Sequence, residues 1–260
     1  MALANTMRDA DARTLTKSTE MSFDGVVKRF PTGTTALDGI DLKVGRGDFV
    51  AVVGPSGCGK STLLRMAAGL DIPTDGSVAV GTESVGFIFQ EPTLLPWRTV
   101  RRNVELTAEL GHLPRGERRD RAAAAIAAVG LGDFEDQLPR ALSGGMKMRA
   151  SLARSLALAP EVLLLDEPFG ALDEMTRLDM QVELQKLYTE KRFTAMFITH
   201  SVSEAVFLAN RVVVMTARPG RIAEVVDVDF PYPRGPELRY DPRFTDHVSR
   251  ISASLHGSAR

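Results

Sequence analysis

The sequence predicts an α/β fold with a parallel sheet at its core. Short apolar segments alternate along the chain with segments of helical spacing, as expected when helices connect parallel strands. Residues 162–165 are entirely apolar, which is typical of a central strand buried on both faces. A glycine-rich loop at residues 54–61 joins an expected strand directly to an expected helix.

Taken in order, the elements are delimited by changes of periodicity and by Gly and Pro. The expected strands are residues 22–30, 40–44, 49–53, 77–80, 85–89, 162–165, 194–198, 211–215 and 222–228. The expected helices are residues 60–68, 100–110, 117–129, 143–158, 174–190 and 201–209, with a short one at 244–255. Gly69 stops the first helix, Pro114 and Gly130 bound the third, and residues 131–142 are loop-like or weakly helical.

Composition excludes several classes of protein. The chain has 260 residues, 44% of them hydrophobic and 25% charged, which is ordinary for a folded domain. One Cys excludes a disulfide scaffold and a Cys-rich zinc site, and fits a reducing cytosol. A net charge of -1 argues against non-specific electrostatic binding of nucleic acid by the protein as a whole. No apolar segment approaches the roughly 18 residues of a membrane helix.

We expect three parts. Residues 1–20 are polar and aperiodic, with no signal-peptide core, and predict a flexible arm. Residues 21–230 form the main domain, with a helical subdomain at about 91–160. Residues 231–260 form a Pro- and Arg-rich tail, too short for a separate domain. A regulatory appendage, a dimer contact and a loose end remain open for this tail.

Residues 54–61 match the phosphate-binding loop G-x-x-x-x-G-K-[ST] at every fixed position. The loop reads Gly54, Pro55, Ser56, Gly57, Cys58, Gly59, Lys60, Ser61. Its backbone N–H groups converge on phosphate oxygens at a helix N-terminus. Lys60 would reach the β- and γ-phosphates, Ser61 would bind Mg²⁺, and Thr62 would donate to the α-phosphate. Cys58 is either a reactive thiol or, as we favour, a small residue that the loop tolerates.

Two further motifs follow. An apolar strand ends in Asp166 and Glu167, where an α/β sheet places ligands. Asp166 would hold Mg²⁺ through water, and Glu167 would polarise the attacking water. Leu142, Ser143, Gly144 and Gly145 begin another helix, with Ser143 as its N-cap. By itself this tetrapeptide indicates only a capped helix, but it stands about twenty residues before the Asp-Glu strand.

Together these motifs resemble the ATP-binding subunit of an ABC transporter, over about residues 22–228. The family order of aromatic residue, phosphate loop, Gln, L-S-G-G signature, Asp-Glu strand, A-L-D loop and His is complete here. The remaining members are Phe30, Gln90, Ala171, Leu172, Asp173 and His200. The resemblance implies an ABC-type fold with a mixed, mainly parallel sheet, an antiparallel β part and a helical subdomain.

The resemblance also implies a role for each residue. Phe30 would stack on adenine, and Gln90 would sense Mg²⁺ and the attacking water. His200 would contact the γ-phosphate and orient Glu167 or the water. Ser143 and Gly145 would bind the γ-phosphate held by a second subunit, and Asp173 would couple the two subunits. The implied unit is a head-to-tail dimer, homomeric or with a paralogous ATPase, that encloses two ATP molecules with Mg²⁺.

Two departures from the family pattern follow the signature. Met146 and Met148 stand where Gln is commoner in the family, which leaves the turnover rate of the ATPase open. A third departure lies before the phosphate loop, where Phe30 replaces a commoner Tyr. Met146 and the segment at 90–100, with Leu-Leu-Pro-Trp-Arg after Gln90, resemble the nitrate, sulfonate and taurine importer branch. In the family this region receives the coupling helix of the membrane subunit. Leu94, Leu95 and Trp97 are equally consistent with a docking surface and with core packing.

The resemblance implies an ATP-hydrolysing subunit of an importer for a small oxyanion. It would dock on transmembrane permease subunits at the cytoplasmic face of the cell membrane, with an extracytoplasmic solute-binding protein in the complex. One alternative is a soluble ABC ATPase acting on nucleic acid or ribosomes, which the neutral charge and the absence of a heptad run disfavour. Another is a nonenzymatic nucleotide-dependent regulator, which the intact Lys60, Asp166, Glu167 and His200 disfavour.

Overall fold

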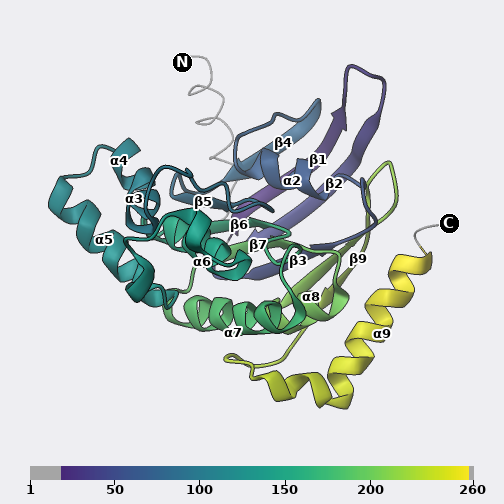
Figure 1. The fold of residues 1–260 in the computed structure, drawn as a ribbon. Helices are drawn as coiled ribbons and strands as arrows, with labels where there is room; N and C mark the ends of the chain where they lie inside the picture. The colour runs from purple at the N-terminus through teal and green to yellow at the C-terminus, as the bar shows by residue number, and fades with distance from the viewer. Residues whose placement is uncertain (1–18, 258–260) are drawn as a thin grey trace. The chain divides into compact units, whose positions relative to one another are not determined.

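A computed structural model describes residues 19–257 of the chain. The expected arm at residues 1–20 lies mostly outside the described residues, and its last two residues already belong to the first strand, β1 (Thr19–Arg29). The described chain forms two compact units (Figure 1). Unit 1 comprises residues 19–83 and 193–257, and unit 2 comprises residues 84–192.

Unit 1 contains a three-stranded antiparallel sheet. Strand β1 lies between β2 (Thr35–Gly45) and β4 (Asp75–Val80), and Phe23 faces Leu42 on one side and Val78 on the other. Along β2, buried residues alternate with more exposed ones from Ile40 to Val44, so one face of this strand is apolar. The sequence predicted β2 only from Ile40, because residues 36, 38 and 39 are Ala, Asp and Gly, which are depleted in strands.

Unit 1 also contains parallel strands, of which β3 leads into the phosphate loop. Strand β3 (Phe49–Val53) pairs in parallel with β7 (Thr194–Ile198) and with β8 (Arg211–Met215). Strand β9 (Ile222–Asp227) runs antiparallel to β8. Every residue of β3 and β7 is buried, as expected for strands covered on both faces.

Three helices complete unit 1. Helix α2 (Lys60–Ala67) contacts β7 and β4, and α8 (Val202–Leu208) contacts β3 and β8. Helix α9 (Pro242–Gly257), yellow in Figure 1, contacts α8, β8 and β9. It buries Phe244 and Ile251. The tail is therefore a packed part of unit 1, and its helix is longer than the predicted 244–255.

Unit 2 is mainly helical. Strands β5 (Val85–Ile88) and β6 (Val162–Asp166) pair in parallel. The helices are α3 (Val100–Val104), α4 (Leu106–Leu110), α5 (Arg115–Ala128), α6 (Gly144–Leu156) and α7 (Glu174–Lys191). Helix α6 contacts β5, α3, α4, α5 and α7 and is the centre of the unit.

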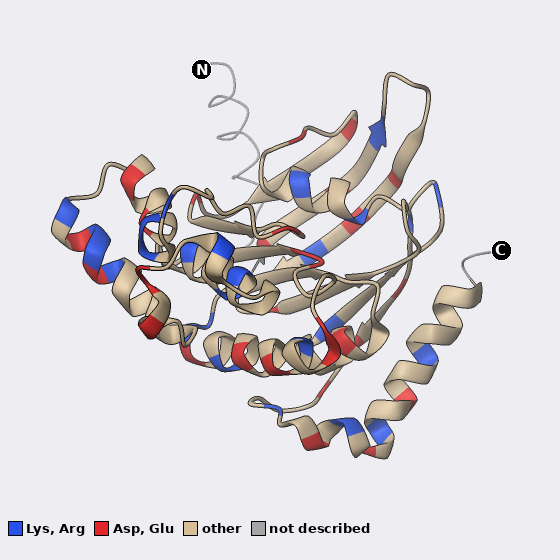
Figure 2. Ribbon diagram, viewed as in Figure 1, with Lys and Arg blue, Asp and Glu red and all other residues tan. Residues whose placement is uncertain are grey.

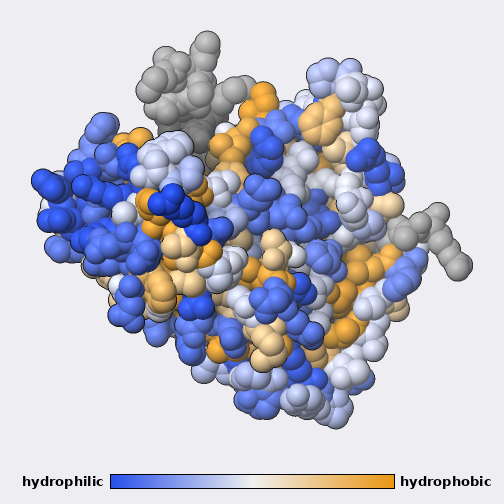
Figure 3. Space-filling model, viewed as in Figure 1, coloured by the Kyte–Doolittle hydropathy of each residue, from blue (hydrophilic) through white to orange (hydrophobic). Residues whose placement is uncertain are grey.

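The predicted helix at 100–110 is two short helices that meet at Glu105, and residues 131–142 form two 3-10 turns, Gly132–Phe134 and Pro139–Ala141. The first half of α5 carries Arg, Glu and Asp side chains (Figure 2), which gives this part of the helix a hydrophilic surface (Figure 3). Within residues 19–257, no helix is both long and apolar enough to span a membrane.

Candidate functional site

The phosphate loop bends so that only glycine fits at two of its positions. Gly57 and Gly59 have φ values of 74° and 99°, in the left-handed region that other residues rarely adopt. Gly59 is also the N-cap of α2, and no side chain caps this helix. The first backbone N–H groups of α2 therefore remain directed toward an anion, with the positive end of the helix dipole behind them.

Close packing restricts the same loop. A Cβ placed on Gly59 would lie 2.6 Å from Leu37 Cδ2 and 3.0 Å from the Ala36 carbonyl oxygen, both on β2. A Cβ on Gly54 would lie 2.8 Å from Cys58 Sγ. The start of β2 thus holds the loop from one side, and this support has no signature in the motif itself.

Lys60 crosses the loop from the first turn of α2. Its Nζ donates hydrogen bonds to the carbonyl oxygens of Gly54 at 2.8 Å and Pro55 at 3.0 Å, and the side chain is buried. These contacts hold the ammonium group within its own loop. A phosphate bound there would meet a cation whose position is already restricted. The contact of Lys60 with the β- and γ-phosphates stays a prediction.

Cys58 is a buried residue of the loop, not an exposed thiol. Burial raises the pKa of its thiol, although the nearby Lys60 charge acts in the opposite direction. A buried thiol with a raised pKa is a poor nucleophile. The structure therefore agrees with the favoured interpretation of Cys58 as a small tolerated residue.

A second support comes from the loop between β8 and β9, which sequence reasoning did not single out. Arg218 donates from Nε and Nη2 to the Gly57 carbonyl oxygen, at 3.2 and 3.1 Å. Gly220 packs so closely on the Cys58 carbonyl that no Cβ fits there, and its N–H donates to the Ala36 carbonyl oxygen at 2.9 Å. The phosphate loop is thus held between β2 and the β8–β9 loop.

Strand register brings the His of the motif set to the same sheet edge as the phosphate loop. Val52 of β3 pairs with Ile198 of β7, so Gly54 and His200 each lie two residues beyond paired positions. Parallel strands place their carboxyl ends together, where α/β proteins bind ligands. His200 is exposed at this edge, as required for contact with a ligand.

Phe30 directly follows β1 and is 37% exposed, which leaves ring surface available for stacking. The Lys28 ammonium lies 5.6 Å from the ring centroid and is held by Asp71 Oδ1 at 2.5 Å and by the Ile72 carbonyl oxygen. An aromatic face can stack on a nucleobase without a hydroxyl group. The replacement of Tyr by Phe therefore leaves the expected function of this position intact.

In unit 2, Gln90 and Glu167 converge. Ile88 of β5 pairs with Leu165 of β6, and the two polar residues each lie two positions beyond this pair. A Cβ placed on Gly170 would lie 3.9 Å from both Gln90 Nε2 and Glu167 Oε2. Glu167 also has a φ of 44°, an uncommon conformation for a residue with a side chain, and such outliers cluster at functional sites.

Asp166 is the last residue of β6 and is half-buried. The described residues contain no group of three or more His, Cys, Asp or Glu side chains that could hold a metal ion. Mg²⁺ usually takes one or two carboxylates together with waters and substrate phosphates. Asp166 and the Gln90 amide oxygen in unit 2, and separately the Ser61 hydroxyl group in unit 1, are oxygen donors of the kind that such an ion takes.

The signature begins α6, as its sequence predicts. The Ser143 hydroxyl group accepts a hydrogen bond from the Met146 N–H at 3.3 Å and caps the helix. Ser143 and Gly144 are exposed, whereas Gly145 is buried so close to Thr176 of α7 that a Cβ would clash. The exposed start of α6 offers backbone N–H groups to an anion.

Asp173 caps the neighbouring helix α7. Its carboxylate accepts from the Thr176 N–H at 3.0 Å and from the Thr176 hydroxyl group at 2.7 Å. These hydrogen bonds lower the pKa of the Asp173 carboxyl group. The A-L-D loop thus has a local structural role that its resemblance to a coupling element did not indicate.

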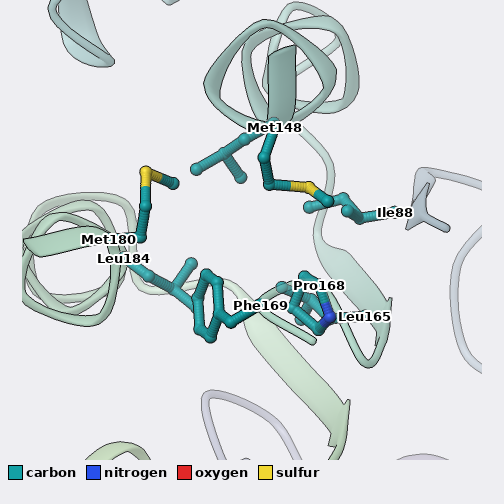
Figure 4. A pocket seen from close by; sticks show the side chains of 8 residues that line it. Ile88, Met148, Leu165, Pro168, Phe169, Met180 and Leu184 are labelled. Atoms are coloured by element: carbon teal, nitrogen blue, oxygen red, sulfur yellow. The ribbon is translucent and has the colours of Figure 1, made fainter. Parts of the chain in front are cut away.

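Met148 is only 2% exposed and lines a small apolar cavity of about 10 Å³ in unit 2 (Figure 4). The cavity lies between α6, α7 and the end of β6, and its other lining residues are Ile88, Leu152, Leu165, Pro168, Phe169, Met180 and Leu184. Pro168 and Phe169 directly follow Glu167. Met148 is therefore a core residue beneath the Glu167 turn, which suits Met better than Gln.

The segment after Gln90 is fixed by polar side chains of the helices. Asn103 accepts from the Leu95 N–H at 2.7 Å and donates to the Leu95 carbonyl oxygen, and Arg154 donates to the Thr93 carbonyl oxygen at 2.9 Å. Trp97 is 72% exposed, whereas Leu94 and Leu95 are half-buried. Of the two open alternatives, Trp97 fits a surface position.

The loop at residues 54–61 needs glycine at several positions and leads into a helix without a side-chain cap, at the carboxyl ends of parallel strands. This arrangement defines a phosphate-loop nucleotide-binding protein. The sequence matches the family described as ABC transporter over residues 37–170. A putative ATP-binding protein of Brucella abortus is 50% identical over 239 residues, 89% of this chain and 92% of that protein. The chain therefore belongs to the ABC transporter family and is an ATP-binding ATPase.

Two further relatives carry more specific names. The aliphatic sulfonates import ATP-binding protein of Mesorhizobium japonicum is 51% identical over 218 residues, 82% of this chain and 81% of that protein. The bicarbonate transport ATP-binding protein of Synechococcus elongatus is 43% identical over 228 residues, 82% of this chain and 34% of that protein. These names are consistent with the predicted nitrate, sulfonate and taurine branch.

Solved structures show the same fold. A dimeric ATP-binding cassette in a post-hydrolysis state, bound to ADP and phosphate, superposes with a TM-score of 0.72 and is 30% identical. The match covers 81% of this chain and all of that chain. A subunit of an ABC transporter complex from Clostridium perfringens gives a TM-score of 0.75 at 26% identity, over 92% of this chain and 98% of that one. The predicted ABC-type fold is confirmed.

Proposed function

We propose that this ATPase is the energy-coupling subunit of an importer for a small oxyanion. The observation that carries the hydrolytic part is the convergence of Gln90 and Glu167 on Gly170, in a chain with a complete phosphate loop. The importer assignment is supported by relatives named for import of aliphatic sulfonates and for transport of bicarbonate.

In the proposed reaction, water attacks the γ-phosphate of ATP. The loop N–H groups, Lys60 and Thr62 bind the phosphates, and Phe30 stacks on the adenine. Ser61, Gln90 and, through water, Asp166 would hold Mg²⁺, which would supply charge neutralisation of the phosphates. Glu167 accepts a proton from the attacking water, which Gln90 orients, and His200 donates a hydrogen bond to the γ-phosphate. Positioning and electrostatic stabilisation supply the rate enhancement.

The proposed active unit is a head-to-tail dimer, either a homodimer or a heterodimer with a paralogous ATPase. Ser143, Gly144 and Gly145 would contact the γ-phosphate bound by the other subunit, with Leu142 packed beneath them. The exposed N-terminus of α6 supports this role. Ala171, Leu172 and Asp173 would couple the two subunits, and solved ATP-binding cassettes of the same fold are dimeric.

The proposed membrane partners are permease subunits, and an extracytoplasmic solute-binding protein would complete the complex. The segment around Trp97 is the proposed contact, because it combines an exposed aromatic side chain with a backbone fixed by Asn103 and Arg154. A fixed exposed aromatic residue loses little entropy on binding. The chain would lie at the cytoplasmic face of the cell membrane, held there by protein contacts.

The proposed solute is a nitrate-, sulfonate- or taurine-class oxyanion. The test is a Glu167→Gln variant, expected to bind ATP but to hydrolyse it at least about 100-fold more slowly. Isolated from native membranes in ATP, this variant should retain a permease and its neighbouring binding protein. Recovery of soluble partners alone, or ATPase stimulation by DNA or RNA, would contradict the transport assignment.

A further inference from the structure

We propose that Thr199 and Glu204 are positioning residues for His200, and that the C-terminal tail supports them through Arg239. The proposal deepens the proposed function, because it rests on His200 acting at the γ-phosphate. The tail is the segment that begins at residue 231, for which the sequence left several alternatives open.

Thr199 fixes the turn that carries His200 through hydrogen bonds to strand β3 and to the start of helix α8. The Thr199 N–H donates to the Val52 carbonyl oxygen at 3.3 Å, on the strand that leads into the phosphate loop. The Thr199 hydroxyl group donates to Glu204 Oε2 at 2.6 Å and accepts from the Ser201 N–H at 3.0 Å. The residues on both sides of His200 are therefore fixed, whereas His200 itself is exposed.

The same contacts form a relayed capping box. Ser201 is the N-cap of α8, and its hydroxyl group accepts from the Glu204 N–H at 3.3 Å. In an ordinary capping box the Glu at this position reaches back to the N–H of the cap residue. Here the Thr199 hydroxyl group lies between the Glu204 carboxylate and the Ser201 N–H. This one hydroxyl group therefore connects the end of strand β7, the His200 turn and helix α8.

Burial restricts the geometry of the Thr199–Glu204 hydrogen bond. Thr199 is 2% exposed and Glu204 is 7% exposed. A buried carboxylate is tolerated only with hydrogen-bond donors or cations close to it, so its geometry is more closely fixed than that of a surface pair. A turn fixed in this way holds the imidazole of His200 in a restricted set of positions before substrate binds.

The tail supplies a cation to this cluster. The Arg239 guanidinium carbon lies 3.7 Å from the centroid of the Phe207 ring on α8. Burial lowers the pKa of Arg239, and the negative charge of Glu204 acts in the opposite direction. Arg234, which is buried, donates to the carbonyl oxygens of Val206, Phe207 and Ala209, at 2.9, 3.1 and 3.0 Å. A cation at these last carbonyl groups complements the helix dipole. The tail thus holds α8 at its C-terminal end, and the charge of Arg239 acts on Glu204 near the N-terminal end of the helix.

The test compares Thr199→Val, which removes the hydroxyl group at constant shape, with Thr199→Ser, which retains it. In the full chain we expect Thr199→Val to lower kcat by about tenfold to 100-fold, with the Kd for ATP changed by less than about twofold. Thr199→Ser should restore most of the rate. Equal losses in both variants, or a loss of ATP affinity without a loss of kcat, would overturn the proposal.

A spectroscopic measurement separates positioning from general damage. The chain has four histidines, so its imidazole NMR signals resolve into a small set. Thr199→Val should shift the signal of His200 and leave those of His112 and His256 unchanged. An unchanged His200 signal in a folded variant would contradict the proposal whatever the ATPase rate.

A double-mutant cycle separates this inference from the function on which it rests. In a His200→Ala background, Thr199→Val should cause no further loss of kcat, because the residue that it positions is gone. Additive losses would refute the positioning role. If His200→Ala alone left kcat unchanged, the proposed role of His200 would fail, while the NMR shift would still decide whether Thr199 positions its ring.

The contribution of the tail is tested by Arg239→Met, with Arg243→Met as the matched control. Arg243 lies on the same segment but is exposed and pairs with Asp241. Arg239→Met should shift the His200 signal and lower kcat by about threefold to tenfold. Arg243→Met should do neither. Equal effects of the two substitutions on kcat and on the His200 signal would contradict a specific role of Arg239 in supporting Thr199 and Glu204.

Discussion

Arg218 donates two hydrogen bonds to the carbonyl oxygen of Gly57, although the two residues are 161 positions apart in the chain. Gly57 needs its left-handed conformation to turn its neighbours' N–H groups toward a phosphate. A partner for its carbonyl group stabilises that conformation before nucleotide binds. Preorganisation of this kind improves affinity by reducing the ordering required on binding.

Arg218→Gln should therefore weaken ATP binding by about threefold to tenfold, since a typical hydrogen bond contributes about 1 kcal/mol. Titration calorimetry with ATP in the absence of hydrolysis measures the change. Arg221→Gln is the control, because Arg221 lies on the same loop but pairs with Asp38. Equal losses of affinity in the two variants would contradict a specific role for Arg218.

Gly170→Ala should lower kcat by about tenfold and leave ATP affinity unchanged, because the added methyl group would occupy the space between Gln90 and Glu167. The closest contact of this Cβ would be 3.4 Å, so the fold should tolerate it. Gly116→Ala, on an open position of α5, is the control for the loss of glycine. Unchanged hydrolysis by Gly170→Ala would show that the water does not lie between these side chains.

Met148→Gln would introduce the commoner family residue and should destabilise the protein by about 1–3 kcal/mol, since its amide would be buried without provision for hydrogen bonds. Met148→Leu conserves volume and should cost less than about 1.5 kcal/mol. Urea unfolding of both variants measures the difference. A Gln variant as stable as the parent would indicate that the cavity accepts water or a polar partner.

Asp173 gives a pH-dependent contribution to stability. Its pKa is lower in the folded chain than in the unfolded chain, so its contribution is present above the unfolded pKa of about 4. It is lost as the pH falls through the lower folded value. Asp173→Asn should keep the cap of α7 and remove this pH dependence, whereas Asp173→Ala should lose both. Thermal unfolding between about pH 3 and pH 7 distinguishes them.

Cys58 should react slowly with thiol reagents at neutral pH, because it is buried and its pKa is raised. The rate should rise with pH and should rise strongly on unfolding. Cys58→Ala should retain ATPase activity, since no proposed step uses the thiol. Rapid stoichiometric labelling of the folded protein at pH 7 would contradict the buried position of this residue.

The motif residues and most elements were predictable because their chemistry requires fixed local spacing. Lys60 must stand at the start of a helix that follows a glycine-rich loop, and Glu167 must follow an apolar strand. The supports of the site were not predictable in this way. Arg218 and Leu37 contact the loop from segments far apart in sequence, and no periodicity marks that contact.

Other differences arise from tertiary contacts that override local preference. Ala36, Asp38 and Gly39 are poor strand formers, yet they belong to β2 because Thr35 and Leu37 pair with β1. Met148 belongs to a catalytic signature by sequence, but its side chain packs in the core. Trp97 is exposed, although an apolar residue beside Leu94 and Leu95 was equally consistent with burial.

Unit 1 joins residues 19–83 to residues 193–257, which the ribosome makes at different times. Strand β3 and the phosphate loop leave the ribosome early, but β7, β8 and Arg218 follow only after the whole of residues 84–192. A nascent chain that ends before residue 193 therefore carries the motif without its neighbours. Competence to bind nucleotide should appear late in translation, so an unfinished subunit would neither sequester nor consume ATP.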